Sequence, residues 1–410
     1  MSLADNIDFL RRLPNAARIG GAAGRARARL PARSPLVEVR EFGANPGALR
    51  MFAFVPGNLQ QPRALVVVLH GCGQTAAGYD LGAGWSTLAK HYGFALLMPE
   101  QQLGNNANGC FNWFNRDDTA REHGEAASVR QMIARMAADH GIDSRRVFIT
   151  GLSAGGAMTS VMLATYPEVF AAGAIIAGLP FGVASNVREA LTGMRGWRAR
   201  SPRELGDFVR KASHHRGKWP KLSVWHGSVD PVVNPANADE IVKQWVDVHQ
   251  LPAMPMSEGI VNGHPHRVWW NADGETVVES YTITDMAHGT PLGLADNDNR
   301  YGNGGAFLIE AGISSSYLIA KFFGLTSWIR DRKAQAPKLA AADSPSAKLI
   351  PRVSPISPPA SAAMPDLSRV LWPLATLQPR PRPAKNKPRR RGIDVGAMIT
   401  RALTAAGLMK

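Results

Sequence analysis

Cysteine is scarce in this sequence of 410 residues, which contains only Cys72 and Cys110. Two cysteines form at most one disulfide within a chain, so a fold held together by several bridges is excluded. The length suits one large domain with tails, or two small domains. Hydrophobic residues make up 45% of the sequence, which is typical of a protein that folds around its own apolar core.

Long apolar runs are missing as well. No segment approaches the roughly 20 apolar residues that a membrane-spanning helix requires. The first twelve residues lack the apolar centre of a signal peptide, because Asp5 and Asp8 lie where an uncharged stretch is needed. Taken by itself, this beginning predicts a protein that stays in the cytoplasm.

Acidic residues are few near the end of the chain. Residues 331–410 contain 15 Lys and Arg but four Asp and Glu, which gives +11 of the total net charge of +15. The first 330 residues therefore carry a net charge of +4, much of it from arginines before residue 34. Because the centre of the chain is nearly neutral, the basic balance predicts no specific nucleic-acid partner for it.

The composition divides the chain into four parts. Residues 1–35 are rich in Arg, Ala and Gly and are expected to form a flexible basic arm, and residues 36–328 the main domain. Residues 329–392 form a linker, rich first in Pro, Ala and Ser and then in basic residues, which is expected to be disordered. Residues 393–410 have the spacing of a short amphipathic helix. Docking of this helix on its own domain or a partner is favoured, and contact of the basic tail with an anionic surface is the alternative.

Apolar runs alternate with helical patterns through most of the main domain. The fully apolar run at residues 65–69 is typical of a strand buried on both faces of a parallel sheet. Residues 36–40 and 50–55 alternate like an antiparallel edge, and residues 271–274 read as the turn of a hairpin. This order predicts an α/β fold, with a mostly parallel central sheet and helices on both faces.

The most informative segment is Gly151-Leu152-Ser153-Ala154-Gly155, which follows an apolar, strand-like run and precedes a helical pattern. A strand, a G-x-S-x-G turn and a helix together form a nucleophile elbow, which presents a serine at the edge of a sheet. Glycines on either side allow neighbouring backbone to pass close to a strained serine. We therefore expect Ser153 to be a catalytic nucleophile; an ordinary turn between strand and helix is the alternative.

A nucleophilic serine needs a base, and the base needs an acid that orients it. After such an elbow the usual chain order is Ser, Asp or Glu, and then His. Asp230 follows the strand-like run at residues 221–226 and is predicted to be the acid, while His288 follows the run at 277–283 and is predicted to be the base. The competing residues are His226, His264 and His266 for the base and Asp285 for the acid, with His226 read as a structural contact and Asp285 as a turn former.

An oxyanion hole needs two backbone N–H groups that point to the place where negative charge develops. The residue after the nucleophile, Ala154, is expected to supply one of them. The loop His70-Gly71-Cys72-Gly73-Gln74 follows the buried run at 65–69, so Cys72 is expected to supply the other. A tight exit from a strand is the alternative explanation of this loop.

These segments together resemble esterases of the polyhydroxybutyrate-depolymerase type, which are α/β-hydrolases related to feruloyl and acetylxylan esterases. The resemblance extends from about Val37 to Leu325, and the matching segments are residues 69–74, 110–114, 151–158, 226–230 and 287–289. It implies the α/β-hydrolase fold, with Ser153 as nucleophile, Asp230 as acid, His288 as base and Cys72 as oxyanion donor.

The resemblance also implies that Cys72 and Cys110 form a disulfide, which would hold the oxyanion loop against the segment at 110–114. Many relatives are secreted, and such a bridge would favour an extracellular location. Aromatic side chains are expected to line an apolar substrate groove, namely Trp113 and Phe114, with Phe181 and Trp225 as further candidates. Each of them could equally belong to the core.

The expected protein is a serine carboxylic-ester hydrolase that acts through an acyl-enzyme and uses neither a metal ion nor a cofactor. The resemblance favours poly- or oligo-(3-hydroxybutyrate) as the ester substrate. The first alternative is a feruloyl or acetylxylan esterase, and transfer of the acyl group to an alcohol would use the same acyl-enzyme. An alternative of another class is a non-catalytic protein that binds a granule or another surface with its tails.

Overall fold

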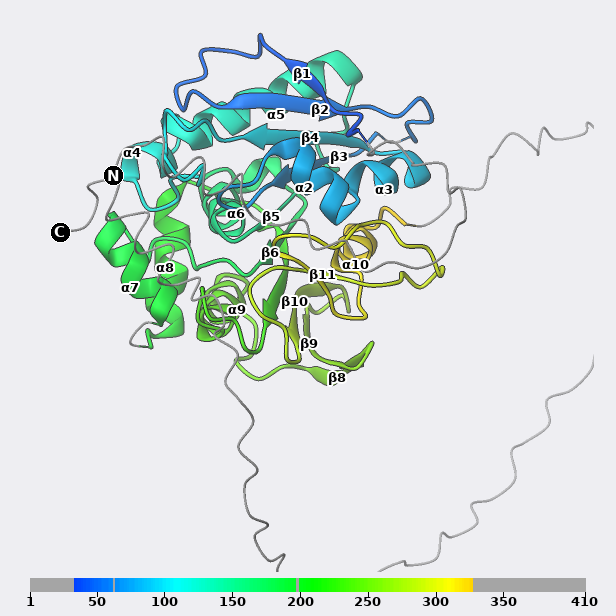
Figure 1. The fold of residues 1–410 in the computed structure, drawn as a ribbon. Coiled ribbons are helices and arrows are strands. Elements are labelled where there is room, and N and C mark those ends of the chain that lie inside the picture. The colour runs from blue at the N-terminus through cyan, green and yellow to red at the C-terminus, as the bar shows by residue number, and fades with distance from the viewer. Residues whose placement is uncertain (1–32, 62, 197–198, 327–410) are drawn as a thin grey trace, which may run out of the picture. The chain divides into compact units, whose positions relative to one another are not determined.

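The computed structural model describes residues 33–61, 63–196 and 199–326 (Figure 1). All of these residues belong to one compact unit. Residues 1–32 of the predicted arm, the whole of the predicted linker at 329–392 and the predicted helix at 393–410 lie outside the described residues. Among the described residues, none of the helices has both the length and the apolar character needed to span a bilayer.

The described part contains twelve strands. Ten of them form one sheet in the order β1-β2-β4-β3-β5-β6-β7-β10-β9-β8, and β11 and β12 form a separate parallel pair. Their bounds are β1 Val37–Val39, β2 Arg50–Phe54, β3 Leu65–Leu69, β4 Ala95–Glu100, β5 Val147–Leu152, β6 Ala172–Ile176, β7 Lys221–Gly227, β8 Ser257–Val261, β9 His264–Trp270, β10 Thr276–Ile283, β11 Thr290–Leu292 and β12 Leu308–Glu310.

The centre of the large sheet is parallel and both of its margins are antiparallel. Strands β4, β3, β5, β6, β7 and β10 run in the same direction. At one margin β2 is antiparallel to β4 and to β1, and at the other β9 is antiparallel to β10 and to β8. The prediction of a mostly parallel sheet is therefore confirmed, together with the antiparallel edge and the hairpin.

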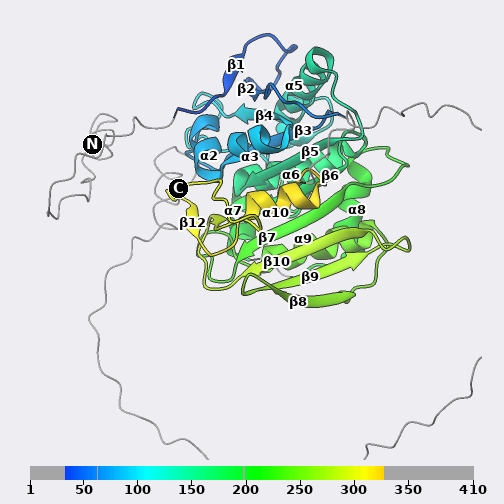
Figure 2. The same ribbon diagram turned by 90° about the vertical axis from the view of Figure 1, so that its right-hand side faces the viewer.

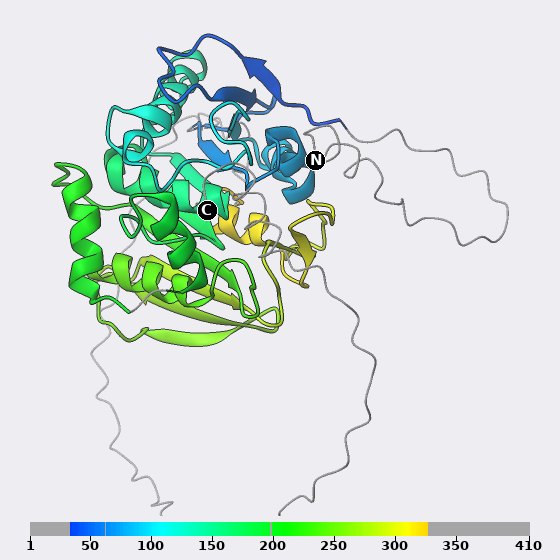
Figure 3. The same cartoon turned by 60° about the vertical axis from the view of Figure 1, so that its left-hand side comes forward.

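Helices cover both faces of this sheet. Their bounds are α2 Ala76–Ala83, α3 Trp85–Tyr92, α4 Arg116–Thr119, α5 Gly124–His140, α6 Ala154–Thr165, α7 Val187–Arg195, α8 Pro202–Ala212, α9 Ala236–Val248 and α10 Ser315–Phe322, with a 3-10 turn at Pro167–Val169. Helices α2, α3 and α10 share one apolar cluster on one face (Figure 2). Helices α5, α6 and α9 contact the sheet, and α8 packs on α9 and α6; Figure 3 brings the green helices α7 and α8 forward.

The apolar pattern explains which strands lie at the centre. All five side chains of β3 are buried, as its unbroken Leu-Val-Val-Val-Leu sequence predicts for a strand with helices on both sides. In contrast, four of the five residues of β8 are exposed, which fits its place at the margin of the sheet. The carboxyl ends of the parallel strands meet at one edge of the sheet, and that edge carries the site described below.

Seven helices and strands of the described part were not expected from the sequence, namely α2, α4, α7, α8, β8, β11 and β12. Helix α8 does carry the usual start signal, because Ser201 precedes Pro202 and its side chain accepts a hydrogen bond from the N–H of Glu204. The apolar pattern of this segment is weak, because it is rich in charged residues and buries only Leu205, Gly206 and Val209 of its helix.

Candidate active site

Ser153 lies between the end of β5 and the start of α6, as a nucleophile elbow requires. Its backbone has φ 58° and ψ −117°, a conformation that costs a non-glycine residue energy and is found mainly at functional sites. Two hydrogen bonds hold this turn, from the N–H of Ser153 to the carbonyl of Ile176 at 2.9 Å and from the N–H of Ala157 to the carbonyl of Ser153 at 2.8 Å.

Glycines on both sides of Ser153 make room for this turn. A Cβ on Gly151 would overlap the carbonyl of Gly155, and a Cβ on Gly155 would overlap the carbonyls of Leu69 and His70. The first turn of α6 therefore packs directly against the end of β3 and the start of the following loop. The two glycines of the G-x-S-x-G motif thus bring the serine and the predicted oxyanion loop together.

Asp230 lies in the loop after β7 and is only 6% exposed. Its Oδ1 accepts hydrogen bonds from the backbone N–H groups of Val232 at 2.8 Å and Val233 at 2.9 Å. Its Oδ2 faces His288 Nδ1 at 2.7 Å and His226 Nε2 at 3.2 Å. Burial alone would raise the pKa of Asp230, but the hydrogen bonds from the two histidines outweigh burial and hold the pKa far below its usual range.

His288 lies in the loop after β10 and is also buried. Because its Nδ1 donates to Asp230, the neutral ring keeps Nε2 free to accept a proton. The loops after β7 and β10 are joined by backbone hydrogen bonds from Ser228 to Ile283 and from Val229 to Met286. A Cβ on Gly227 would overlap the carbonyl of Met286, so the glycine permits this close approach.

The competing residues have other partners. His264 Nε2 lies 2.8 Å from the carbonyl of Ala311, and its Nδ1 accepts from the N–H of Thr284. His266 Nε2 lies 3.1 Å from the Glu279 carboxyl. Asp285 is exposed and has φ 55°, the left-handed conformation of a turn residue. Of the predicted acid and base, Asp230 and His288 lie within hydrogen-bond distance of each other, at 2.7 Å.

His226 has a role in the site that the sequence did not reveal. Its Nε2 lies 2.9 Å from the carbonyl of Val233 and 3.2 Å from Oδ2 of Asp230. Since a carbonyl only accepts, Nε2 carries the proton, and the same N–H is shared with Asp230. The signal in the sequence was its position, four residues before the acid and at the end of the same strand.

The two predicted oxyanion donors lie at the same edge of the sheet as Ser153. Ala154 is the first residue of α6, so its N–H lacks a partner within the helix, and the helix dipole there favours negative charge. Cys72 lies in the loop between β3 and α2. No acceptor for its N–H exists among the residues that the structure describes.

The loop that contains Cys72 is fixed on several sides. The N–H of Gly71 donates to the side-chain oxygen of Gln74 at 2.8 Å, and the N–H of Gly73 donates to the carbonyl of Asn108 at 2.9 Å. Cys72 also forms a disulfide with Cys110, which confirms the pairing that the family resemblance implied. The loop is therefore held rigidly before any substrate arrives.

The aromatic residues near the site have different environments. Trp113 is 9% exposed, and its ring meets the ring of Phe114 edge to face with the centroids 5.5 Å apart. Phe114 and Phe181 are partly exposed. Trp225 is fully buried and stacks on Tyr281 at 3.8 Å, so of the two environments left open for it the core is the one found.

Metal-binding side chains are not assembled in the described ranges, where no group of three or more His, Cys, Asp or Glu is arranged to hold an ion. The polar groups at the sheet edge are a carboxylate paired with a histidine, a serine in a strained conformation and two backbone N–H groups. This combination supports nucleophilic attack on an acyl carbon followed by release of an alcohol or amine.

Comparison with known proteins places this site in a family context. A family model described as esterase PHB depolymerase matches residues 50–255. Poly(3-hydroxyalkanoate) depolymerase C of Paucimonas lemoignei is 46% identical over 291 residues, which cover 71% of this chain and 70% of that protein. Acetylxylan esterase of Coprinopsis cinerea is 32% identical over 263 residues, which cover 62% and 69%.

A solved structure shares the fold. The acetyl xylan esterase of Aspergillus awamori superposes with a TM-score of 0.57 at 28% sequence identity. The match covers 62% of this chain and 93% of that one. Nearly all of the Aspergillus awamori enzyme is therefore matched, and most of the unmatched residues are in the present chain.

Proposed function

This chain belongs to the esterase PHB depolymerase family and is a carboxylic-ester hydrolase, and we propose that it cleaves poly- or oligo-(3-hydroxybutyrate) esters through Ser153. The proposed acid is Asp230, the proposed base is His288, and the proposed oxyanion donors are the N–H groups of Cys72 and Ala154. The observation that carries this proposal is the 2.7 Å hydrogen bond between His288 Nδ1 and Asp230.

The proposed first half-reaction transfers the acyl group to the enzyme. His288 Nε2 takes the proton of Ser153 while Oγ attacks the ester carbonyl carbon, and the carbonyl oxygen gains negative charge. The N–H groups of Cys72 and Ala154 bind this oxygen. The C–O bond to the leaving group then breaks, His288 returns the proton to the departing oxygen, and an alcohol leaves.

The second half-reaction restores the serine. Water gives a proton to His288 and attacks the acyl carbon, and collapse of the new intermediate releases a carboxylic acid and returns the proton to Ser153. Asp230 stabilises the charged ring of His288 at each stage, because its carboxylate accepts from Nδ1. Its two backbone donors, from Val232 and Val233, keep the carboxylate in place.

The polyester substrate is supported by the relative with 46% identity, whose name describes a poly(3-hydroxyalkanoate) depolymerase. A second candidate is an acetylxylan ester, favoured by the relative with 32% identity and by the shared fold of the Aspergillus awamori enzyme. The proposed substrate groove contains Trp113 and Phe114, of which Phe114 is the more accessible.

The test compares wild type with Ser153→Ala on p-nitrophenyl butyrate, on amorphous poly(3-hydroxybutyrate) and on acetylated xylan. Loss of the serine is expected to lower kcat by about 10⁴-fold or more. Release of 3-hydroxybutyrate by wild type alone supports the polyester proposal. Release of acetate from xylan without release from the polymer supports the second candidate, and equal activity of wild type and variant contradicts the catalytic assignment.

The basic C-terminal region is proposed to contact an anionic surface, because residues 331–410 carry a net charge of +11. Replacing Lys385, Lys387, Arg389, Arg390 and Arg391 by serine should weaken sedimentation with anionic lipid vesicles at low salt. Equal sedimentation of wild type and variant with the vesicles, or sedimentation that does not depend on salt, contradicts this proposal.

A further inference from the structure

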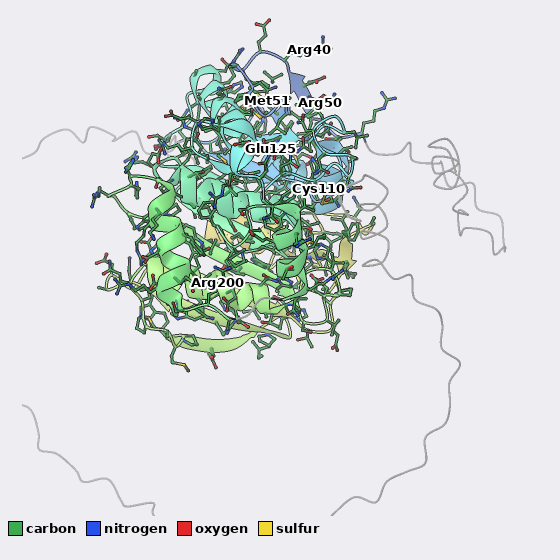
Figure 4. The ribbon with its side chains drawn as sticks, turned by 90° about the vertical axis from the view of Figure 1, so that its left-hand side faces the viewer. Arg40, Arg50, Met51, Cys110, Glu125 and Arg200 are labelled. Carbon is green, nitrogen blue, oxygen red and sulfur yellow. A yellow bond between two sulfur atoms is a disulfide. The ribbon has the colours of Figure 1, made fainter. Side chains whose placement is uncertain are left out.

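Two buried polar side chains, Gln101 and Glu125, lie behind the oxyanion loop and have no part in the proposed proton transfers. Gln101 directly follows β4 and is 6% exposed, and Glu125 lies in the first turn of α5 and is fully buried. Figure 4 labels Glu125 and, below it, Cys110 of the disulfide. Buried polar groups of this kind carry a cost unless every partner is present, so their partners show what they hold in place.

Gln101 uses all of the hydrogen-bonding groups of its side chain. Its Nε2 donates to the carbonyl of Cys110 at 3.0 Å and also to Oε1 of Glu125. Its Oε1 accepts from the N–H of Gln102 and from Nδ2 of Asn105, both at 2.9 Å. The amide is therefore saturated and fixed in one orientation, with its NH₂ group on the Cys110 side.

The backbone of Gln101 supports the other half of the disulfide. Its N–H donates to His70 Nε2 at 3.1 Å, so the ring proton of the neutral histidine lies on Nδ1. Nδ1 then donates to the carbonyl of Gly71 at 2.8 Å. Burial lowers the pKa of His70, which keeps the ring neutral and this tautomer in place.

The bond to Gly71 fixes the direction of the proposed oxyanion donor. The carbonyl of Gly71 and the N–H of Cys72 belong to one trans peptide group, in which they point in opposite directions. Anchoring that carbonyl on His70 therefore turns the N–H of Cys72 away from the anchor. On the other side of the disulfide, Oε2 of Glu125 accepts from the N–H of Asn112 at 2.8 Å. This bond holds the loop segment that contains Cys110.

We infer that Gln101 and Glu125 are positioning residues that hold the Cys72 N–H in its oxyanion-binding orientation from both sides of the Cys72–Cys110 disulfide. This inference rests on the proposed function of the site. The backbone N–H of Gln101 holds His70, which in turn holds the carbonyl of Gly71 beside Cys72. The side chains of Gln101 and Glu125 hold the segment of Cys110, which is bonded to Cys72. Neither side chain touches the substrate.

Glutamate is suited to this position because both of its oxygens can accept, whether the group is ionised or one oxygen carries a proton and accepts through its remaining lone pair. A glutamine at residue 125 would offer one acceptor and one NH₂ group, so it would turn a donor toward either Gln101 Nε2 or the N–H of Asn112. One of the two bonds that fix the Cys110 segment would be lost at nearly constant side-chain volume. Glu125→Gln therefore tests the network without opening a cavity.

The experiment compares Glu125→Gln with wild type, using kcat and KM on p-nitrophenyl butyrate and the Ki of butylboronic acid, whose tetrahedral adduct with a serine resembles the transition state. Loss of an oxyanion donor costs about 10²- to 10³-fold in kcat, so misplacement of one is expected to cost about 10- to 100-fold. KM should change less than about threefold, and Ki should rise in proportion to the fall in kcat. Gln101→Met should give the same pattern.

Glu240→Gln is the matched control, because Glu240 is a buried glutamate on α9 that pairs with Lys243 and accepts from the N–H of Arg200. It should lower the unfolding midpoint without changing kcat of the folded protein. The inference is overturned if Glu125→Gln behaves in the same way as this control, with an unchanged kcat and Ki. An active Ser153→Ala would contradict the proposed function itself, whereas an inactive Ser153→Ala with an unaffected Glu125→Gln contradicts only the inference.

Discussion

The two sides of the candidate site are built by different means. On the acid–base side, the loops after β7 and β10 meet through a carboxylate, Asp230, that accepts from two histidines and two backbone N–H groups. On the oxyanion side, the loop after β3 is held by a disulfide, by a neutral histidine and by a saturated amide. One side depends on charge, and the other depends on covalent and neutral contacts.

This difference follows from what each side has to do in the proposed reaction. His288 gains and loses a proton, so its support must become stronger when the ring is charged, and a carboxylate has that property. The oxyanion donors keep the same protonation throughout and only need to stay in place, which neutral contacts achieve without adding a charge that would compete with the substrate. A charged group thus supports the residue whose charge changes, and neutral contacts support the backbone donors whose charge stays the same. The following predictions test this difference.

The largest effect is expected for the acid. Asp230→Asn should lower kcat by about 10⁴-fold, because an amide at this position favours the wrong tautomer of the histidine. The measurement is kcat for p-nitrophenyl butyrate, with circular dichroism to show that the fold is kept. Asp285→Asn is the control, since Asp285 is close in sequence to His288 but exposed, and its kcat should stay near the wild-type value. A similar loss in both variants would count against Asp230 as the acid.

A smaller effect is expected when the disulfide is removed. Cys72→Ser with Cys110→Ser should lower kcat by about 10- to 100-fold, because one oxyanion donor loses its anchor. The bridge spans 38 residues, so its loss should also lower the free energy of unfolding by about 3 to 4 kcal/mol. Denaturant unfolding measures the second effect. A stability loss without a change in kcat would show that the bridge supports the fold but not the reaction.

His226→Gln should have a milder effect, a reduction of kcat by roughly 10-fold or less, because the glutamine NH₂ can still donate to Asp230 and to the carbonyl of Val233. His226→Leu removes this donor and should have the larger effect. The two variants should be compared at several pH values, since the hydrogen bond from His226 is one of the causes that hold the pKa of Asp230 low. Identical pH profiles of His226→Gln and His226→Leu would show that the hydrogen bond from His226 does not support Asp230.

The smallest effect concerns stability and pH. Burial raises the pKa of Glu125 from 4.5 to about 8 in the folded protein. Between these values the folded state binds a proton that the unfolded state has released, so the free energy of unfolding should fall as pH rises from about 4.5 to 8. Glu125→Gln lacks this contribution, and the difference between the two proteins should level off outside that range. A difference that is constant from pH 4.5 to 8 would contradict the raised pKa.

Much of the fold was predictable from local patterns. The unbroken apolar run of β3, the alternation at β1 and β2 and the elbow around Ser153 each indicate one arrangement from neighbouring residues alone. The candidate acid and base followed from chain order. These features are local, or follow from the direction of parallel strands, so the sequence contains them directly.

The support of the site was not predictable in the same way. Gln101 and Glu125 act through contacts between segments that are distant in sequence, and nothing beside them distinguishes them from other polar residues. His226 is close to Asp230 in sequence, but its contact depends on how the loop after β7 folds back on the strand. For Trp225 the sequence left a groove and the core equally open, and the burial of its ring against Tyr281 decides for the core. Such roles are set by three-dimensional packing and therefore need coordinates.

The order of the strands also has a consequence for the way the enzyme reaches its active form. Cys72, Ser153 and His288 follow β3, β5 and β10, and β10 joins the parallel strands beyond β7. During synthesis the serine leaves the ribosome 135 residues before the histidine, and contacts between segments so far apart form late because they close long loops. The proposed nucleophile therefore exists for some time without its proposed base, and the recovery of esterase activity during refolding should report the final docking of β10 on β7.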